Sequence, residues 1–92
     1  MALTLEWSEE ALEDIESIAT YIEKDSPTYA KSVVSKFFEK AEILQEFSEL
    51  GRIVPEFNDI TIREIFVYSY RLIYKLSKEK ILLVAIVHGK RL

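Results

Sequence analysis

The sequence predicts an α+β domain in which a helical hairpin packs on a curled, mainly antiparallel sheet, with the element order β-α-α-β-β-β. Apolar residues recur every three or four positions through residues 9–47, which is the spacing of amphipathic helices. After Pro55 the pattern becomes extended, and β-branched and aromatic residues dominate. The connections between these extended segments are too short for a parallel return, so neighbouring strands should be antiparallel.

The first strand and first helix are expected on either side of Ser8. Residues 2–7 alternate weakly between apolar and polar side chains. The Ser8 hydroxyl can accept a hydrogen bond from an amide of the first helical turn, and the acidic residues that follow suit the positive end of the helix dipole. The helix should end near Asp25, and its core stripe consists of Ala11, Ile15, Ile18, Ala19 and Ile22.

A second helix is expected to start at Ser26-Pro27, because proline in the first helical position loses no intrahelical hydrogen bond. Gly51 should close this helix of roughly 20 residues in the left-handed conformation. Its apolar face carries Ala30, Val34, Phe37, Ala41 and Leu44, widened by Val33, Phe38 and Phe47.

Three strands are expected at residues 60–68, 70–76 and 81–88. The turns around Ser69 and across residues 77–80 join them into an antiparallel meander. The last strand is apolar on both faces, which predicts an interior position covered by the hairpin.

Length and composition indicate one domain, residues 1–92, with 49% hydrophobic side chains. The absence of cysteine excludes disulfides, thiolate metal sites and a cysteine nucleophile, and with a single histidine we expect no metal and no cofactor. The N-terminus lacks a signal-peptide pattern, and the longest apolar run, residues 81–87, is far shorter than the roughly 20 residues that span a bilayer. We therefore expect a cytoplasmic protein without membrane contact.

Charge is distributed unevenly along the chain. Residues 1–51 hold twelve acidic side chains against four lysines, a balance of −8, whereas residues 52–92 hold eight basic against four acidic, a balance of +4. Two explanations of this asymmetry stay open. The second half of the chain could be a cationic element for an anionic target, or the asymmetry could reflect only the solvated, Glu-rich helices of the first half.

Several motifs follow one another along nearly the whole chain. They are a Trp-containing first strand, the helix restart at Ser26-Pro27, Gly51-Arg52, Val54-Pro55-Glu56, Ile62-Arg63-Glu64, Tyr70-Arg71-Leu72-Ile73-Tyr74 and His88-Gly89-Lys90-Arg91. In this order they resemble the RelE/ParE toxin superfamily, whose members are often labelled plasmid stabilisation proteins.

The resemblance implies a growth-inhibiting toxin of a type II toxin–antitoxin module, held inactive in a hetero-oligomer with a cognate antitoxin. ParE-like members poison DNA gyrase without turning over a substrate, whereas RelE-like members are mRNA interferases that cleave mRNA on the ribosome. An inactive, solitary toxin that keeps only antitoxin binding is a third interpretation. The resemblance therefore leaves open whether the chain is an enzyme.

The same resemblance implies candidate site residues. In a nuclease, Arg71 and Arg91 match phosphate-binding arginines, and His88 matches a catalytic histidine suited to acid–base exchange near neutral pH. The candidates for binding a target or a phosphate are Arg63, Arg71, Lys90 and Arg91, with Arg52 and Glu56 as weaker ones. Without the resemblance, Arg71 and His88 are ordinary strand positions, and Arg52 could pair with Glu56 across the Pro55 turn.

Two departures favour the ParE-like interpretation. RelE-like enzymes carry a lysine pair on the strand before Tyr-Arg, where this chain reads Ile62-Arg63-Glu64-Ile65, and no tyrosine follows Arg91. The acidic chain is also poorly suited to the dense phosphates of a ribosome. The long hairpin also looks more ParE-like. We therefore expect a gyrase-directed toxin, whose antitoxin fills a sheet edge and an apolar groove between hairpin and sheet.

Overall fold

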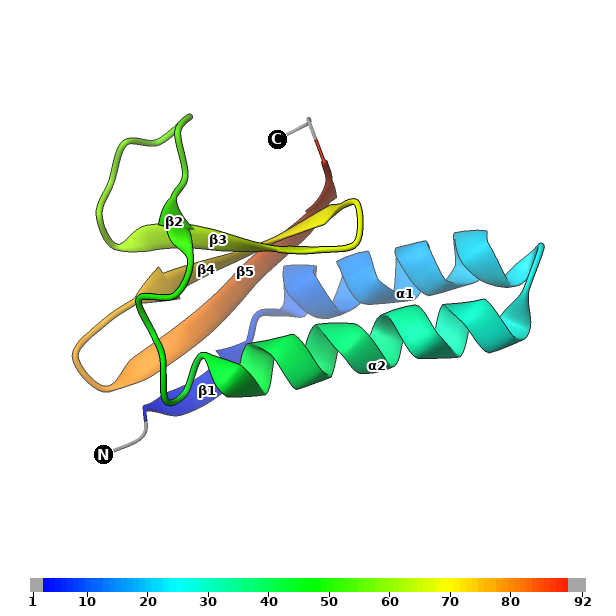
Figure 1. The fold of residues 1–92 in the computed structure, drawn as a ribbon, viewed down its shortest axis with the longest axis horizontal. Helices are drawn as coiled ribbons and strands as arrows, with labels where there is room; N and C mark the ends of the chain where they lie inside the picture. Colours follow the sequence, from blue (N-terminus) through cyan, green and yellow to red (C-terminus); the bar gives the residue numbers. More distant parts are fainter. Residues whose placement is uncertain (1–2, 90–92) are drawn as a thin grey trace.

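The computed structural model describes residues 3–89 and confirms the α+β fold, with the helical hairpin on one face of an open sheet (Figure 1). A short strand, β2, lies between the hairpin and the meander. The sequence pattern did not predict it, because a strand of two residues leaves no periodic signal. The elements are β1 (Thr4–Trp7), α1 (Glu9–Glu23), α2 (Pro27–Ile43), β2 (Arg52–Ile53), β3 (Ile62–Val67), β4 (Tyr70–Leu76) and β5 (Lys80–His88).

The strands lie in the order β1-β5-β4-β3-β2. β1 pairs with β5 in parallel, and the other pairs are antiparallel, as expected for the meander. β5 is therefore an interior strand, which confirms the prediction from its apolar faces. The parallel pair is possible because the whole hairpin and meander separate β1 from β5 in the chain.

Polar contacts fix α1 to β5 where β1 ends. The Ser8 hydroxyl caps α1 by accepting from the Ala11 amide at 3.0 Å, as predicted, and donates to the Val84 carbonyl at 3.1 Å. The pairing of β1 with β5 stops at Leu83, and the carboxylate of Asp14 accepts a hydrogen bond from the Ile86 amide at 2.9 Å. A side chain of α1 thus satisfies a β5 amide beyond the end of the neighbouring strand.

α2 starts as expected, since the Ser26 hydroxyl accepts from the Tyr29 amide and Pro27 is the first helical residue. The prediction that Gly51 closes the helix is wrong, because α2 ends at Ile43 and Gly51 does not have a positive φ. Glycine is needed at position 51 for space: a Cβ there would lie 2.6 Å from both the Glu64 carbonyl oxygen and the Tyr74 hydroxyl.

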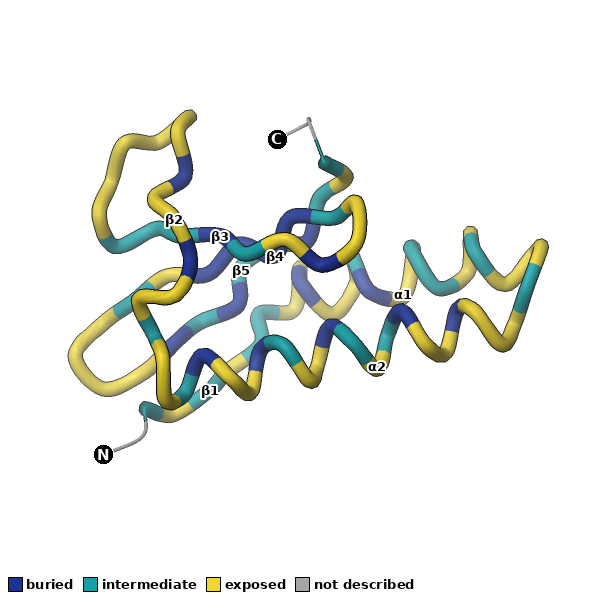
Figure 2. The backbone as a smooth tube through the Cα atoms, viewed as in Figure 1, coloured by how far each residue is buried: buried dark blue, intermediate teal, exposed yellow. Residues whose placement is uncertain are grey.

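The hydrophobic core lies between the hairpin and the sheet, and the buried stripes of the helices face it (Figure 2). Its buried members are Ala11, Ile15, Val33, Phe37, Ala41, Leu44, Val67, Leu72, Tyr74, Ile81, Leu83 and Ile86. Two residues expected on the α2 core face are not buried: Phe38 lies at its margin, 38% exposed and packed against the Trp7 ring at 4.7 Å, and Phe47, 61% exposed, lies beyond the end of the helix.

Tyr74 connects the core to the segment that follows α2. Its ring is fully buried, its hydroxyl donates to the Ser48 carbonyl at 2.8 Å, and the same hydroxyl accepts from the Gly51 amide at 2.9 Å. Burial raises the pKa of Tyr74, so the phenol stays neutral and can donate. This hydroxyl fixes the path of the chain into β2.

A Tyr74→Phe variant is expected to lose about 1–3 kcal/mol of unfolding free energy, because the buried Gly51 amide and the partly buried Ser48 carbonyl lose their partner. Tyr21→Phe, at a position 71% exposed, is the matched control and should be neutral. Urea unfolding of both variants measures the difference. Equal stability of the two would contradict the role assigned to the Tyr74 hydroxyl.

Candidate functional site

The candidate site lies on the face of the sheet opposite the hairpin. Leu72 and Tyr74 belong to the hairpin-side core, so Arg71 and Ile73, which alternate with them along β4, point to the other face. The register pairs Arg71 with Phe66 and Ile73 with Glu64, and β2 adds Arg52 opposite Glu64. Residues paired in this way share a face, so this outer face carries Arg52, Glu64, Phe66 and Arg71.

Glu64 is the buried anion of this face. Its side chain is fully buried, and it accepts hydrogen bonds from Nε of Arg71 and, at 2.6 Å, from Nε of Arg52. Arg71 is also buried, with 3% of its surface exposed. An ionised carboxylate in this position is tolerable only because cations from both neighbouring strands bind it.

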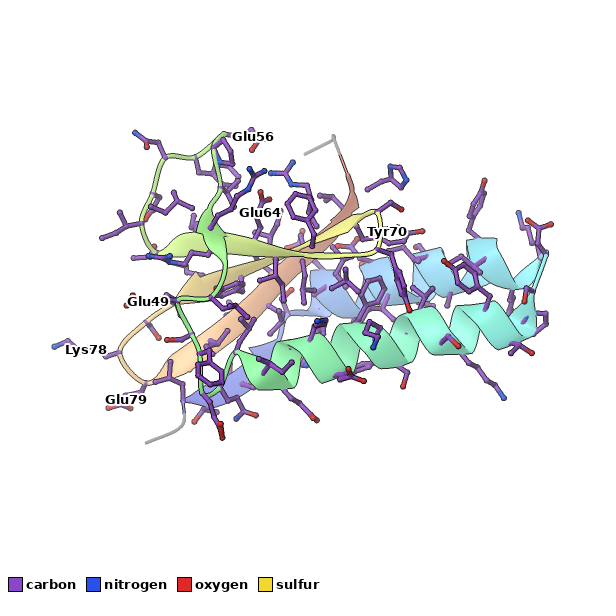
Figure 3. The ribbon with its side chains drawn as sticks, in the orientation of Figure 1. Glu49, Glu56, Glu64, Tyr70, Lys78 and Glu79 are labelled. Atoms are coloured by element: carbon purple, nitrogen blue, oxygen red, sulfur yellow. The ribbon has the colours of Figure 1, made fainter. Side chains whose placement is uncertain are left out.

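Glu56 binds the two terminal nitrogens of the Arg71 guanidinium. Its carboxylate accepts from Nη1 of Arg71 at 3.1 Å and from Nη2 at 2.9 Å, a bidentate contact from the exposed turn after β2. The hydrogen bond from Arg71 lowers the pKa of Glu56, and the same bond is the main reason that the pKa of Arg71 is raised. Figure 3 shows Glu56 and Glu64 on the side of the sheet away from the helices. Arg71 is thus held between two carboxylates.

The accessible part of this face is an arginine beside an aromatic ring. The Arg52 side chain is 56% exposed, and its guanidinium carbon lies 5.2 Å from the centre of the Phe66 ring, which is itself half exposed. A guanidinium over a ring face is a cation–π contact. Two more exposed apolar side chains, Phe57 and Ile60, come from the chain between β2 and β3.

Arg63 points to the hairpin side of the sheet and binds the backbone of the chain segment that contains β2. It pairs with Tyr74 in the β3–β4 register, its Nη1 donates to the Gly51 carbonyl at 3.0 Å, and its Nε donates to the Ile60 carbonyl at 3.2 Å. These bonds connect β3 to Gly51, directly before β2, and to Ile60, at the end of the loop that follows β2. In this structure Arg63 therefore organises a loop.

His88 lies on the hairpin side of the sheet. It pairs with Tyr70 in the β4–β5 register, their rings meet edge-on at 5.5 Å, and Tyr70 packs against Phe37 of α2 at 5.6 Å. Arg71 follows Tyr70 directly, so Arg71 and His88 point to opposite faces. A nuclease site built on both residues would need Arg71 and His88 to face one ligand, and the register contradicts that expectation. Lys90 and Arg91 lie outside the described residues.

The alternative in which Arg52 pairs with Glu56 is also wrong, because Arg52 binds Glu64 and Glu56 binds Arg71. Sequence reasoning missed Glu64 as the residue that joins both arginines. A carboxylate in a strand that is apolar apart from Arg63 was the available signal, but its partners depend on the register of three strands. Within residues 3–89 there is no group of three His, Cys, Asp or Glu side chains placed to hold a metal ion.

Comparison with known proteins identifies the family. The family described as "ParE toxin of type II toxin-antitoxin system, parDE" matches residues 5–92 of this chain. The chain belongs to the ParE toxin family. None of the helices formed by residues 3–89 is both long and apolar enough to cross a membrane.

Solved structures show the same fold as this ParE-family chain. The structure described as "Chromosomal ParDE TA system from P. aeruginosa" is similar with a TM-score of 0.79 at 18% identity, over 97% of this chain and 98% of that one. The structure described as "The structure of YoeB dimer from Staphylococcus aureus" is similar with a TM-score of 0.67 at 18% identity, over 97% and 99% of the two chains. A search of curated protein sequences finds no match.

The two carboxylates of this ParE-family site should differ in their contribution to stability. Glu64→Gln is expected to cost about 3–5 kcal/mol, because it leaves a buried arginine without its fully buried counter-charge. Glu56→Gln should cost much less, because Glu56 is 41% exposed and water can replace it. Chemical unfolding of both variants tests this ranking, and an equal loss would contradict it.

The Glu56–Arg71 contact also predicts a pH dependence. Since the folded-state pKa of Glu56 is lowered from 4.5, its contribution is fully present above that value and is lost as the pH falls through the lowered folded pKa. The stability difference between wild type and Glu56→Gln should therefore be largest near neutral pH and should shrink as the pH falls below 4.5. Unfolding free energies measured at neutral and acidic pH check the sign. A difference that grew in acid would contradict it.

Proposed function

We propose that this ParE-family toxin arrests growth by inhibiting DNA gyrase, acts without turning over a substrate, and is held inactive by a cognate antitoxin. The family match to type II toxin–antitoxin systems supports the toxin role and the antitoxin partner. The similar P. aeruginosa structure is that of a ParDE toxin–antitoxin system, which agrees with a two-component module.

The ion pairs of Arg71 are the main argument for a toxin that is not an enzyme. Cleavage of an RNA phosphodiester needs a base, an acid and cations gathered around one phosphate. Here the Arg71 guanidinium is neutralised by Glu64 and Glu56, and His88 lies on the other face of the sheet. The described residues therefore do not converge on one phosphate, which favours binding over catalysis.

Exposed apolar side chains support a protein partner. Within residues 3–89, twelve large hydrophobic side chains are at least 37% exposed, among them Phe66 on the outer face beside Arg52. Contiguous exposed apolar patches mark protein interaction sites, and the Phe66 ring with the Arg52 guanidinium is a candidate for part of one. A partner that binds only the folded toxin would also raise its thermal stability, by an amount that grows with the logarithm of the affinity.

The proposal predicts that the purified chain inhibits DNA supercoiling by gyrase with accumulation of cleaved DNA, and leaves mRNA intact in a programmed translation reaction. A His88→Ala variant should inhibit gyrase as strongly as wild type, because the proposal gives the imidazole no catalytic role. Cleavage of mRNA between codon bases that His88→Ala abolishes would overturn the gyrase proposal and favour a ribosome-dependent endonuclease.

Expression of the chain in a bacterial host separates an active toxin from an inactive one. Growth arrest that co-expression of the antitoxin relieves is the expected result. A folded chain that binds its antitoxin but never arrests growth would instead be a solitary toxin without activity.

A further inference from the structure

Part of β3 has no strand partner on its outer edge. β2 pairs only with Arg63 and Glu64, so Ile65–Val67 pair with β4 alone. The Leu76 amide donates to the Thr61 carbonyl and the Val54 amide to the Ile62 carbonyl. In an antiparallel ladder the backbone groups of successive residues point to alternate sides. Odd-numbered residues of β3 therefore bond to β4, and even-numbered ones point toward β2.

Phe66 is the even-numbered residue that β2 does not reach. Its backbone amide and carbonyl point sideways from the edge of β3, away from β4, and within residues 3–89 no strand pairs with them on that side. An edge with an unpaired donor and acceptor is a template for another peptide backbone. The ligand that suits this edge is thus an extended polypeptide, since a nucleic acid has no backbone of this pattern.

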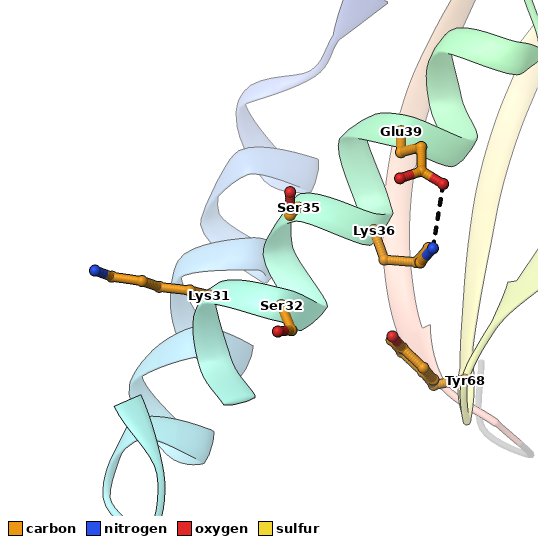
Figure 4. A pocket seen from close by; sticks show the side chains of 6 residues that line it. All are labelled: Lys31, Ser32, Ser35, Lys36, Glu39 and Tyr68. Carbon is orange, nitrogen blue, oxygen red and sulfur yellow. Dashed lines mark hydrogen bonds and ion pairs between the residues drawn. The ribbon is translucent and has the colours of Figure 1, made fainter. Parts of the chain in front are cut away.

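A polar groove lies beside the end of β3, between the β3–β4 turn and α2 (Figure 4). It encloses about 490 Å³. Tyr68, in the turn, is half exposed and adopts a positive φ of 57°, and its ring lies 6.3 Å from that of Tyr29 on α2. The residues lining the groove are Lys31, Ser32, Ser35, Lys36, Glu39 and Tyr68.

This groove is cationic although the hairpin as a whole is acidic. No acidic residue occurs between Asp25 and Glu39, and the lysines at positions 31 and 36 both line the groove. Lys36 pairs with Glu39 at 3.1 Å, but both side chains are partly exposed, so the pair is weak and a carboxylate of a partner can compete with Glu39. The serine hydroxyls add further donors for a carboxylate.

We propose that an extended, acidic segment of the antitoxin adds to β3 beside Phe66 and places its carboxylates on Lys31 and Lys36. The inference rests on the proposed antitoxin partner and adds the place and the chemistry of the contact. Backbone pairing at Phe66 supplies a fixed register, and the lysines select acidic over basic segments. The rings of Tyr29 and Tyr68 provide an aromatic contact at the end of the strand.

The first test measures the affinity of the full-length toxin for the antitoxin encoded beside it, by isothermal titration calorimetry. The double variant K31E/K36E should bind at least ~10-fold more weakly, because two attractive contacts become repulsive. The matched control is K75E/K78E, which makes the same change in net charge at exposed lysines outside the groove. Equal affinities of the two variants would overturn the inference.

The second test follows hydrogen exchange at single amides of the wild-type toxin. In the free toxin the Phe66 amide should exchange faster than those of Ile65 and Val67, and binding of the antitoxin should slow it. A complex in which the Phe66 amide stays unprotected would overturn strand addition, even if the antitoxin binds tightly. Failure of the wild-type toxin to bind the antitoxin at all would instead remove the antitoxin partner from the proposed function.

Discussion

The buried carboxylate of Glu64 is the constraint on which the outer face of the sheet depends. A charge without access to water needs partners that stay in place, and Arg71 of β4 and Arg52 of β2 provide them. A one-residue slip of β3 against β4 would turn Glu64 toward the apolar core and Ile65 away from it, so the ion pairs and the hydrophobic packing select the same register. The short β2 strand is held by the same carboxylate, which explains how two residues suffice to pair with β3.

The two faces of the sheet serve different purposes. The hairpin covers one face with a continuous apolar core, and the only described histidine is part of an aromatic contact there. The other face carries Arg52 and Arg71, but their positive charge is largely compensated by the carboxylates of Glu56 and Glu64. Charge counted along the sequence therefore overstates how cationic this surface is, and the arginine–phenylalanine contact at Arg52 remains its most accessible feature.

The fold recurs in two solved structures that are each 18% identical to this chain, because it depends on patterns more than on particular residues. Amphipathic helices, capped starts and alternating strands can be built from many side chains, whereas a site requires particular residues in a particular register. Similar architecture in a ParDE toxin–antitoxin structure and in a YoeB structure is therefore compatible with different sites on the same sheet.

The sequence by itself determined the elements whose signals are local: both helix starts at Ser8 and Ser26, the strand at residues 70–76, and the antiparallel meander that short turns enforce. Tertiary structure decided what depends on register and on contacts between distant segments. Only the register that pairs Tyr70 with His88 shows that Arg71 and His88 lie on opposite faces of the sheet. Only the packing of Tyr74 and β3 against position 51 shows why this residue is glycine. Likewise, the partners of Glu64 come from the two strands on either side of β3, so they depend on the register of three strands. Local propensity fixes the conformation of a segment, but which side chains meet across a sheet depends on how the strands align, and periodicity along one chain does not encode that alignment.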